Sequence, residues 1–384
     1  MSQMRVILFF LFSVAINYSP LFQASSCIVT LQQYLQVKNN IIISEFSKNI
    51  EIKNKIKQIV VILPGYLISG GPENLCQIYA ALKKLGYEVY CLWINPLDIP
   101  GSIIKKYENG MWYLCKTDAK LVNKIYEQNY NVNYLDKDIP LNESTLVIVP
   151  EIWTDFIYFF EDAKKAIAWL SIAYLNVDNY SEICNSLIKQ KKLAYLDCIH
   201  LSQSPWIQKI LKSWGADSFL LGDYIANQYF IKTPEDKTGE LIAFFPRKGG
   251  DLATKFINKH PDLDCLRLEN FTQSEMIFAL DASKIYIDFG CFPGKDRIPR
   301  EALLRDCVIF INNQGCATDF ESFPIDNYFR FSEQDVLDGT LYRKVQEVFD
   351  DYKNMKEKQL FMKNQIMEEA SLFQQRIEEF FGYP

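Results

Sequence analysis

Cationic side chains gather in one glycine- and proline-containing segment, residues 287–312, and their types suit a phosphate-bearing ligand. The segment reads as a buried strand, an irregular loop, a short helix and a second strand. Three cations lie in the loop and at the start of the helix: Lys295, Arg297 and Arg300. Arginine can bind phosphate oxygens through two parallel hydrogen bonds, and lysine acts as a point charge. The cluster therefore predicts a site that neutralises a diphosphate.

A carboxylate follows these cations at Glu301, where the short helix begins. An ionised carboxylate offers two acceptor oxygens and can accept both hydroxyls of a ribose, a role that acidic residues have in other nucleotide folds. We expect Glu301 to have this role. The alternative is structural, because an acid in the first turn of a helix also stabilises the free backbone N–H groups there.

Two further loops follow predicted buried strands and could reach the same anion. Arg247 and Lys248 stand directly before a glycine pair, and the alternative for them is an ordinary solvated loop. Gly70 and Gly71 follow the apolar run at 59–65 and open a helix. Adjacent glycines let the backbone approach an anion, and a helix N-terminus adds a positive dipole end. An ordinary turn is the alternative here, since neither GxGxxG nor a P-loop lysine is present.

Acidic residues after a third buried strand are candidates for general-base catalysis. Glu151 and Asp155 follow the run at 145–150, and either could take a proton from an acceptor hydroxyl. A surface or helix-capping acid is the competing interpretation for both. His200 lies near another strand end, where a structural histidine is the favoured interpretation.

The elements that must position these side chains alternate between strand and helix. Continuous apolar runs at 59–65, 87–94 and 145–150 predict parallel strands that are buried on both faces. Apolar residues at helical spacing predict a helix over 75–86, and we interpret 161–171 as a helix as well. The same alternation starts again at Leu241, and helices are predicted from about Leu341 to Phe381.

This alternation predicts an α/β fold of two Rossmann-like domains that face each other across a cleft, with helices at the C-terminus. The domains are expected at 57–230 and 238–335, followed by a helical region at 336–384. The segment 231–240 is rich in charge and contains Pro and Gly, so we interpret it as the linker.

The residues Pro299–Phe310, which read PREALLRDCVIF, resemble the second domain of the GT-B-fold glycosyltransferases. In that family a helix Glu binds the ribose of the sugar donor, and the resemblance places Glu301 there. It also places Arg247 and Lys248 at the donor diphosphate, and it places Gly70 and Gly71 in the glycine loop of the first domain. Many members carry another Glu eight residues before the ribose Glu, where this chain has Pro293.

The resemblance implies an enzyme that transfers a sugar from a nucleotide-diphosphate donor to a glycan, a lipid or a small molecule. It implies no cofactor and no metal, because GT-B enzymes can neutralise the leaving diphosphate with protein cations. Two alternatives remain open: an inactive sugar-binding or scaffold relative, which Pro293 favours, and a nucleotide-sugar epimerase. A secreted hydrolase has little support, since the chain has no GxSxG motif.

The composition narrows the remaining classes of partner, metal site and cellular location. A net charge of -6 over 384 residues argues against nucleic acid as a partner, because such proteins usually carry a basic excess. Two histidines and scattered cysteines leave no metal-ligand pattern, and a reducing, cytoplasmic location is expected. Residues 1–27 carry Arg5 and an apolar run, which indicates either a cleaved signal and secretion or a peripheral membrane anchor.

Overall fold

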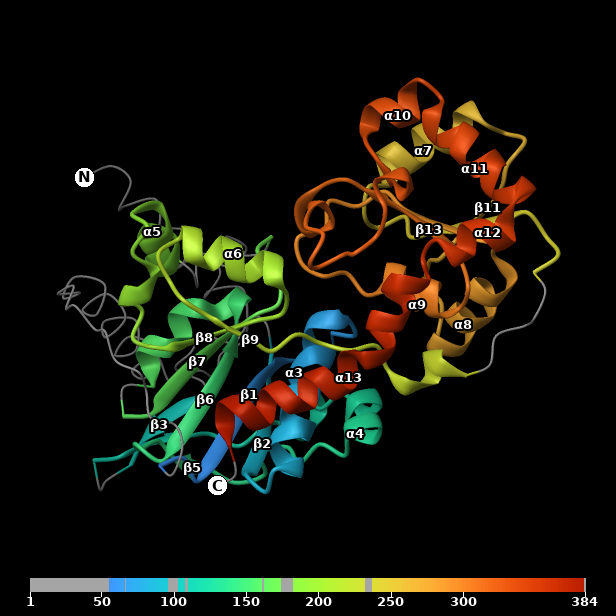
Figure 1. Cartoon of the computed structure of the whole chain (residues 1–384). Coiled ribbons are helices and arrows are strands. Elements are labelled where there is room, and N and C mark those ends of the chain that lie inside the picture. The colour runs from blue at the N-terminus through green and yellow to red at the C-terminus, as the bar shows by residue number, and fades with distance from the viewer. Residues whose placement is uncertain are drawn as a thin grey trace, which may run out of the picture.

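The structure is a computed structural model, and it describes residues 55–65, 67–95, 103–107, 110–160, 162–173, 182–231 and 237–382. The predicted N-terminal segment at 1–27 and part of the predicted linker at 231–240 lie outside these residues. Figure 1 shows two lobes, each built on its own sheet, with the long helix α13 (Leu360–Phe381) extending from one lobe along the other.

The first lobe contains a six-stranded parallel sheet in the order β2-β1-β6-β7-β8-β9. Its strands are β1 (Gln58–Pro64), β2 (Glu88–Ile94), β6 (Thr145–Pro150), β7 (Lys164–Trp169), β8 (Ile199–Ser202) and β9 (Phe219–Leu220). Its helices are α3 (Gly70–Lys84), α4 (Lys124–Tyr130), α5 (Glu182–Lys189) and α6 (Pro205–Ser213). The chain leaves β1 first toward one edge and later toward the other, so the end of β1 is a topological switch point.

Both faces of this sheet are covered, which explains the continuous apolar runs of its strands. Ile59, Val61 and Leu63 point into a core that also contains residues of α3 and α13. Val60 and Ile62 point into the core on the opposite face. Successive side chains of a strand alternate between faces, so a strand buried on both sides must be apolar throughout.

The prediction of a helix at 161–171 is wrong, because this segment contains strand β7. Its six residues read KKAIAW, and such a short apolar run has no periodicity that separates a helix from a buried strand. Pairing with β6 on one side and β8 on the other decides the conformation. The connection before it is the 3-10 helix η3 (Glu151–Phe159).

The second lobe contains a five-stranded parallel sheet in the order β11-β10-β12-β13-β14. Its strands are β10 (Leu241–Phe244), β11 (Asp264–Arg267), β12 (Ile285–Asp288), β13 (Val308–Asn312) and β14 (Arg330–Phe331). Its helices are α7 (Gly250–Lys259), α8 (Gln273–Ala282) and α9 (Ile298–Leu304). The switch point lies between β10 and β12, so the loops after these two strands share one crevice.

The predicted C-terminal helices are confirmed, and they connect the two lobes. They are α10 (Glu333–Leu337), α11 (Thr340–Asp350), α12 (Tyr352–Glu357) and α13. The first half of α13 places Met362 and Ile366 in the core of the second lobe. Its second half places Phe373, Ile377 and Phe381 in the core of the first lobe, beside α3 (Figure 1).

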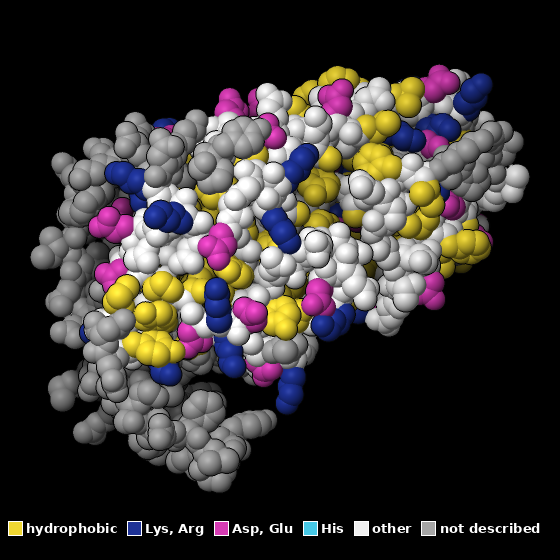
Figure 2. All heavy atoms as spheres, turned by 90° about the horizontal axis from the view of Figure 1, so that it is seen from below, with side chains coloured by type: hydrophobic (Ala, Val, Ile, Leu, Met, Phe, Trp, Pro, Cys, Tyr) yellow, Lys and Arg dark blue, Asp and Glu magenta, His cyan; other side chains and the backbone are white. Residues whose placement is uncertain are grey.

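The remaining described strands form a small antiparallel sheet on the first lobe: β3 (Ile104–Lys106), β4 (Trp112–Leu114) and β5 (Ile139–Pro140). Among the residues described, no helix is both long and apolar enough to span a membrane. On the face shown in Figure 2, Lys and Arg side chains are interspersed with Asp and Glu, so positive charge is not concentrated on the part of that face that is described.

Candidate functional site

The cationic segment lies where the two lobes meet. Strand β12 ends at Asp288, and the loop that follows leads to α9, whose N-cap is Arg297 and which has a proline in its first turn. The backbone N–H of Ile172 in the first lobe donates to the carbonyl of Pro293, at 3.0 Å. Gly294 lies so close to the first lobe that a Cβ there would be 2.3 Å from the Leu170 carbonyl oxygen. We call residues 289–297 the donor loop, after the sugar donor that the resemblance in the sequence predicts here.

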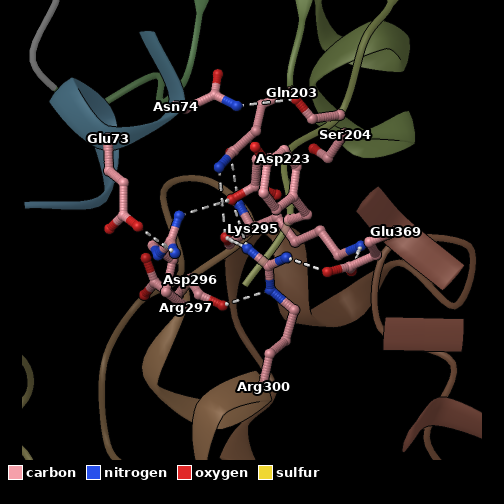
Figure 3. Close-up of polar contacts among 12 residues, drawn as sticks. Glu73, Asn74, Gln203, Ser204, Asp223, Lys295, Asp296, Arg297, Arg300 and Glu369 are labelled. Atoms are coloured by element: carbon pink, nitrogen blue, oxygen red, sulfur yellow. Dashed lines mark hydrogen bonds and ion pairs between the residues drawn. The ribbon is translucent and has the colours of Figure 1, made fainter. Parts of the chain in front are cut away.

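Arg300 is fully buried, and protein groups surround its guanidinium group (Figure 3). Its Nη2 atom is 2.7 Å from Asp223 Oδ2 in the first lobe, and its Nη1 atom is 2.7 Å from Glu369 Oε2 in α13. The same guanidinium donates to the carbonyls of Asp296 and Lys295. In the structure Arg300 thus contacts the donor loop and two buried acids, and its contact with a ligand stays a prediction.

Lys295 is fixed by the same helix. Its Nζ atom is 2.6 Å from Glu369 Oε1, and its backbone N–H donates to the Gln203 side chain at 3.1 Å. Glu369 thus binds two of the three predicted cations at once. Because α13 also packs on the first lobe, the helix holds the donor loop in a fixed relation to that lobe.

Arg297 lies among three carboxylates that come from different elements. Its Nη2 atom is 3.1 Å from Glu73 Oε1 in α3, and its Nη1 atom is 3.8 Å from Asp223 Oδ2. Its Nε atom is 3.6 Å from Glu301 Oε1, one turn along α9. Burial alone would raise the pKa of Asp223, but the charges of Arg300 and Arg297 outweigh that effect and hold it below its usual value.

The predicted glycine loop packs against Arg297. Gly70 is the first residue of α3, and a Cβ on it would be 2.7 Å from Arg297 Cδ. Gly71 follows it in the helix and would place a Cβ in ordinary contact with Leu170. The structure thus brings Gly70 together with Arg297, and Glu73 already sets a negative charge in the first turn of α3. Close packing with Arg297 accounts for the glycine at position 70.

Glu301 is buried in the first turn of α9, with 8% of its surface exposed. The hydroxyl of Tyr229, which lies in the crossover between the lobes, donates a hydrogen bond to its carboxylate. Burial raises the pKa of Glu301 above its usual value, and the charge of Arg297 opposes that rise. Glu301 therefore lies beside the interface between the lobes, next to the place where a ligand between them would bind.

The second predicted cationic pair lies after β10. The Lys248 Nζ atom is 2.7 Å from Asp296 Oδ1, which connects this loop to the donor loop. Arg247 is exposed and donates to the Asn270 side chain at 2.9 Å. Burial, and then the charge of Asp296, raises the pKa of Asp288 to about 6. The structure thus brings Lys248 to the predicted site, and it leaves Arg247 on its outer side.

Buried polar atoms without hydrogen bonds concentrate at this interface. Four of the nine such side-chain atoms in the described part of the chain belong to three residues of the site: Asp223 (Oδ1), Asp296 (Oδ2) and Arg297 (Nη1 and Nη2). The two arginine nitrogens have only the ion pairs given above. Buried polar groups are nearly always hydrogen-bonded, so such a concentration indicates a place that a polar ligand or water fills.

The two candidate bases differ in their contacts. Asp155 is buried, and its two carboxylate oxygens accept the backbone N–H groups of Ile183 and Cys184 at the start of α5. Asp155 therefore caps the start of α5, which was the interpretation that competed with general-base catalysis. Glu151 is buried after β6 and accepts the Leu170 N–H at 3.3 Å. Burial raises its pKa to about 8.

His200 has a structural contact, as favoured from the sequence. Its Nδ1 atom accepts a hydrogen bond from the Trp169 indole at 3.0 Å, and burial lowers its pKa to about 4. Within the described ranges, no group of three or more His, Cys, Asp or Glu side chains is placed to hold a metal ion.

Sequence reasoning missed the acids that organise the site: Glu73, Asp223 and Glu369 (Figure 3). Asp223 and Glu369 lie 77 and 69 residues from Arg300. No local pattern connects such positions. The only available signal was Glu73, a charged residue two positions after the glycine pair at a helix start.

Comparison with known proteins gives a likeness in fold. No family model matches the sequence, and no curated protein matches it. Sucrose-phosphate synthase from Thermosynechococcus elongatus superposes with a TM-score of 0.50 at 10% identity, over 85% of this chain and 95% of that one. An alpha-glucosyltransferase in complex with UDP and a 13-mer DNA gives 0.50 at 9% identity, over 85% and 99%. The chain therefore has the GT-B glycosyltransferase fold, as its sequence predicted.

Proposed function

We propose that this protein is a glycosyltransferase that takes a hexose from a nucleotide-diphosphate sugar. The observation that carries the proposal is the meeting of Lys248 with the donor loop at the lobe interface, where four buried polar atoms have no hydrogen bond. Ligands of open α/β sheets bind at such switch-point crevices. The GT-B fold and the likeness to an alpha-glucosyltransferase in complex with UDP support this choice of ligand.

Each residue of the proposed site has a distinct task. Lys248 neutralises the leaving diphosphate, and Arg247 adds a second cation from the outer side. Glu301 accepts the two ribose hydroxyls. Lys295 and Arg300 support the donor loop through Glu369. The chemistry then rests on positioning the donor and on stabilising the charge that develops on the diphosphate.

The acceptor hydroxyl needs a base, and Glu151 is the stronger of the two candidates. A pKa of about 8 matches the range in which a general base works well near neutral pH. Asp155 has its carboxylate oxygens committed to the N-terminus of α5. Glu151 reaches the interface indirectly, since it holds the backbone of Leu170, which lies against Gly294.

A binding panel tests the proposal. Thermal unfolding is followed with UDP, ADP and GDP and with UDP-glucose, ADP-glucose and GDP-mannose. A ligand present at a hundredfold over its Kd should add about 2.7 kcal/mol of stability. The ligand that binds is then incubated with glycan, alkyl-glycoside and lipid acceptors, and we expect release of the nucleoside diphosphate with one of them.

Two results would contradict the proposal. Absence of stabilisation by every nucleotide and nucleotide-sugar would remove the donor site. Binding without release of nucleoside diphosphate, with or without acceptors, would instead identify the inactive sugar-binding relative that Pro293 favours.

A further inference from the structure

We propose that Arg297, predicted as a ligand for the diphosphate, is instead a positioning residue that keeps the Glu301 carboxylate ionised and aligned for a ribose. The inference rests on the proposed function, because it concerns how the same donor site works. It assigns to Arg297 an action through Glu301 and no contact with the donor, and water would supply the hydrogen bonds that its Nη1 and Nη2 atoms lack.

The geometry of Arg297 carries this assignment. Its guanidinium group is buried, and three protein carboxylates already surround its positive charge. Its Nε atom faces Glu301 at 3.6 Å, while its other nitrogens face Glu73 and Asp223. A Cβ at position 70 would be 2.7 Å from Arg297 Cδ, so the glycine leaves the space that this side chain occupies.

Glu301 needs such a partner because its surroundings disfavour a charge. Burial raises its pKa, and Glu73 in α3 raises it further. Arg297 is the first opposing charge, and Arg300 in α9 and the Tyr229 hydroxyl add to it. Tyr286 in β12 is a neutral phenol whose hydroxyl donates to Asp288, and it interacts with this carboxylate only through its electrostatic field. A protonated Glu301 would offer one acceptor fewer to the two ribose hydroxyls.

The arrangement also makes the state of Glu301 depend on the first lobe. Glu73 and Asp223 belong to that lobe and hold Arg297 in place. Separation of the lobes would remove both acids from Arg297 and leave its side chain without two of its three carboxylate neighbours. The position of Arg297 beside Glu301 therefore depends on contacts from the first lobe.

The test is the pH dependence of donor binding in Arg297→Gln, measured by calorimetry with the whole chain and with UDP-glucose and ADP-glucose as probes. These diphosphate diesters take up no proton between pH 5.5 and 8.5. Loss of the positive charge raises the pKa of Glu301, so the variant should bind progressively more weakly as the pH falls. Below the raised pKa, affinity should fall about tenfold per pH unit, beginning at a higher pH than in the wild type, until it levels off about ten- to a hundredfold lower.

Two further variants separate positioning from mere stability. Arg297→Lys keeps the charge and should return the pH profile toward that of the wild type. Arg305→Gln removes another fully buried arginine, which forms an ion pair with Asp281 at 2.6 Å, and should lower stability without moving the profile.

The possible results are distinct. If the wild type binds neither probe nor any other nucleotide-sugar of the panel, the proposed function fails. If the wild type binds and Arg297→Gln loses affinity equally at all pH values, Arg297 contacts the donor directly and the positioning role is wrong. An unchanged affinity and an unchanged profile in Arg297→Gln would also overturn it.

Discussion

The Glu151 carboxyl group shows how a single buried residue can oppose folding. It is 4% exposed and has a pKa of about 8, so folding disfavours its charged form. The hydrogen bond from Leu170 compensates only in part for the loss of water. Sites that work against stability in this way are common where a residue has a catalytic task.

We predict that Glu151→Gln stabilises the protein at neutral pH. The folded pKa lies above the unfolded value, so the folded state binds more protons between about pH 4.5 and pH 8, and wild-type stability falls as pH rises through this window. Glutamine does not titrate and removes this fall, with a gain of the order of 3 kcal/mol at pH 7.

Urea unfolding at pH 5, 7 and 8 measures the effect, and the exposed Glu143→Gln serves as the control in the same lobe. The two variants should agree near pH 5 and diverge at pH 8. Parallel pH profiles for Glu151→Gln and the wild type would contradict the prediction. If Glu151 is also the base, its variant loses sugar transfer while it gains stability.

Residue types alone brought two residues into the candidate site. Lys248 and Glu301 became candidates because a cation after one strand and an acid at a helix start suit a nucleotide, and their roles stay predictions. The role of Arg300 could not be predicted, because its acidic partners are distant in sequence and the side chain is fully buried. The residue type alone does not distinguish a cation that binds a phosphate from one that forms ion pairs with carboxylates of the protein.

At the scale of elements, α13 has the largest structural role in the site. It carries Glu369 to the donor loop and continues into the core of the first lobe through Phe373 and Ile377. Its helical period was readable from the sequence, since apolar residues recur at three- and four-residue steps. The strand β7 was misread, since tertiary pairing and not its local pattern fixes its conformation.

We predict that Glu369→Gln destabilises the fold by about 3 kcal/mol, the lower end of the range for a broken buried ion pair, because Arg300 keeps Asp223. Glu368→Gln is the matched control, because Glu368 is next to Glu369 on the same helix and its side chain is exposed. It should change the free energy of unfolding by less than about 0.5 kcal/mol. Equal effects of the two substitutions in urea unfolding would show that the contacts of Glu369 contribute little.

At the scale of the whole molecule, the donor loop and the first lobe meet backbone to backbone at Gly294. The sequence predicted two α/β domains that face each other, but it carried no signal for the contacts that fix their relative placement. That placement depends on a few close contacts and on the buried ions, which come from positions far apart in the chain.

We predict that Gly294→Ala separates the lobes. The new Cβ would lie 2.3 Å from the Leu170 carbonyl oxygen, so one of the two backbones must move. Small-angle X-ray scattering should show a larger radius of gyration, and thermal unfolding should show a loss of about 1–3 kcal/mol. Gly239→Ala is the control, because a Cβ there meets nothing within 4 Å. A radius equal to that of the wild type would contradict this account of the interface.

The central claim, that Glu301 binds the ribose of a nucleotide, is tested most directly by the Kd of Glu301→Gln for the nucleotide that the wild type binds. The substitution keeps the size of the side chain but removes its charge and one acceptor. A charged hydrogen bond is worth roughly 1.5–3 kcal/mol, so affinity should fall about ten- to a hundredfold. Glu275→Gln, which alters the capping box of α8, should lose stability and keep its affinity. Wild-type affinity in Glu301→Gln together with a clear drop in Tm would contradict the claim and make Glu301 a structural residue of α9.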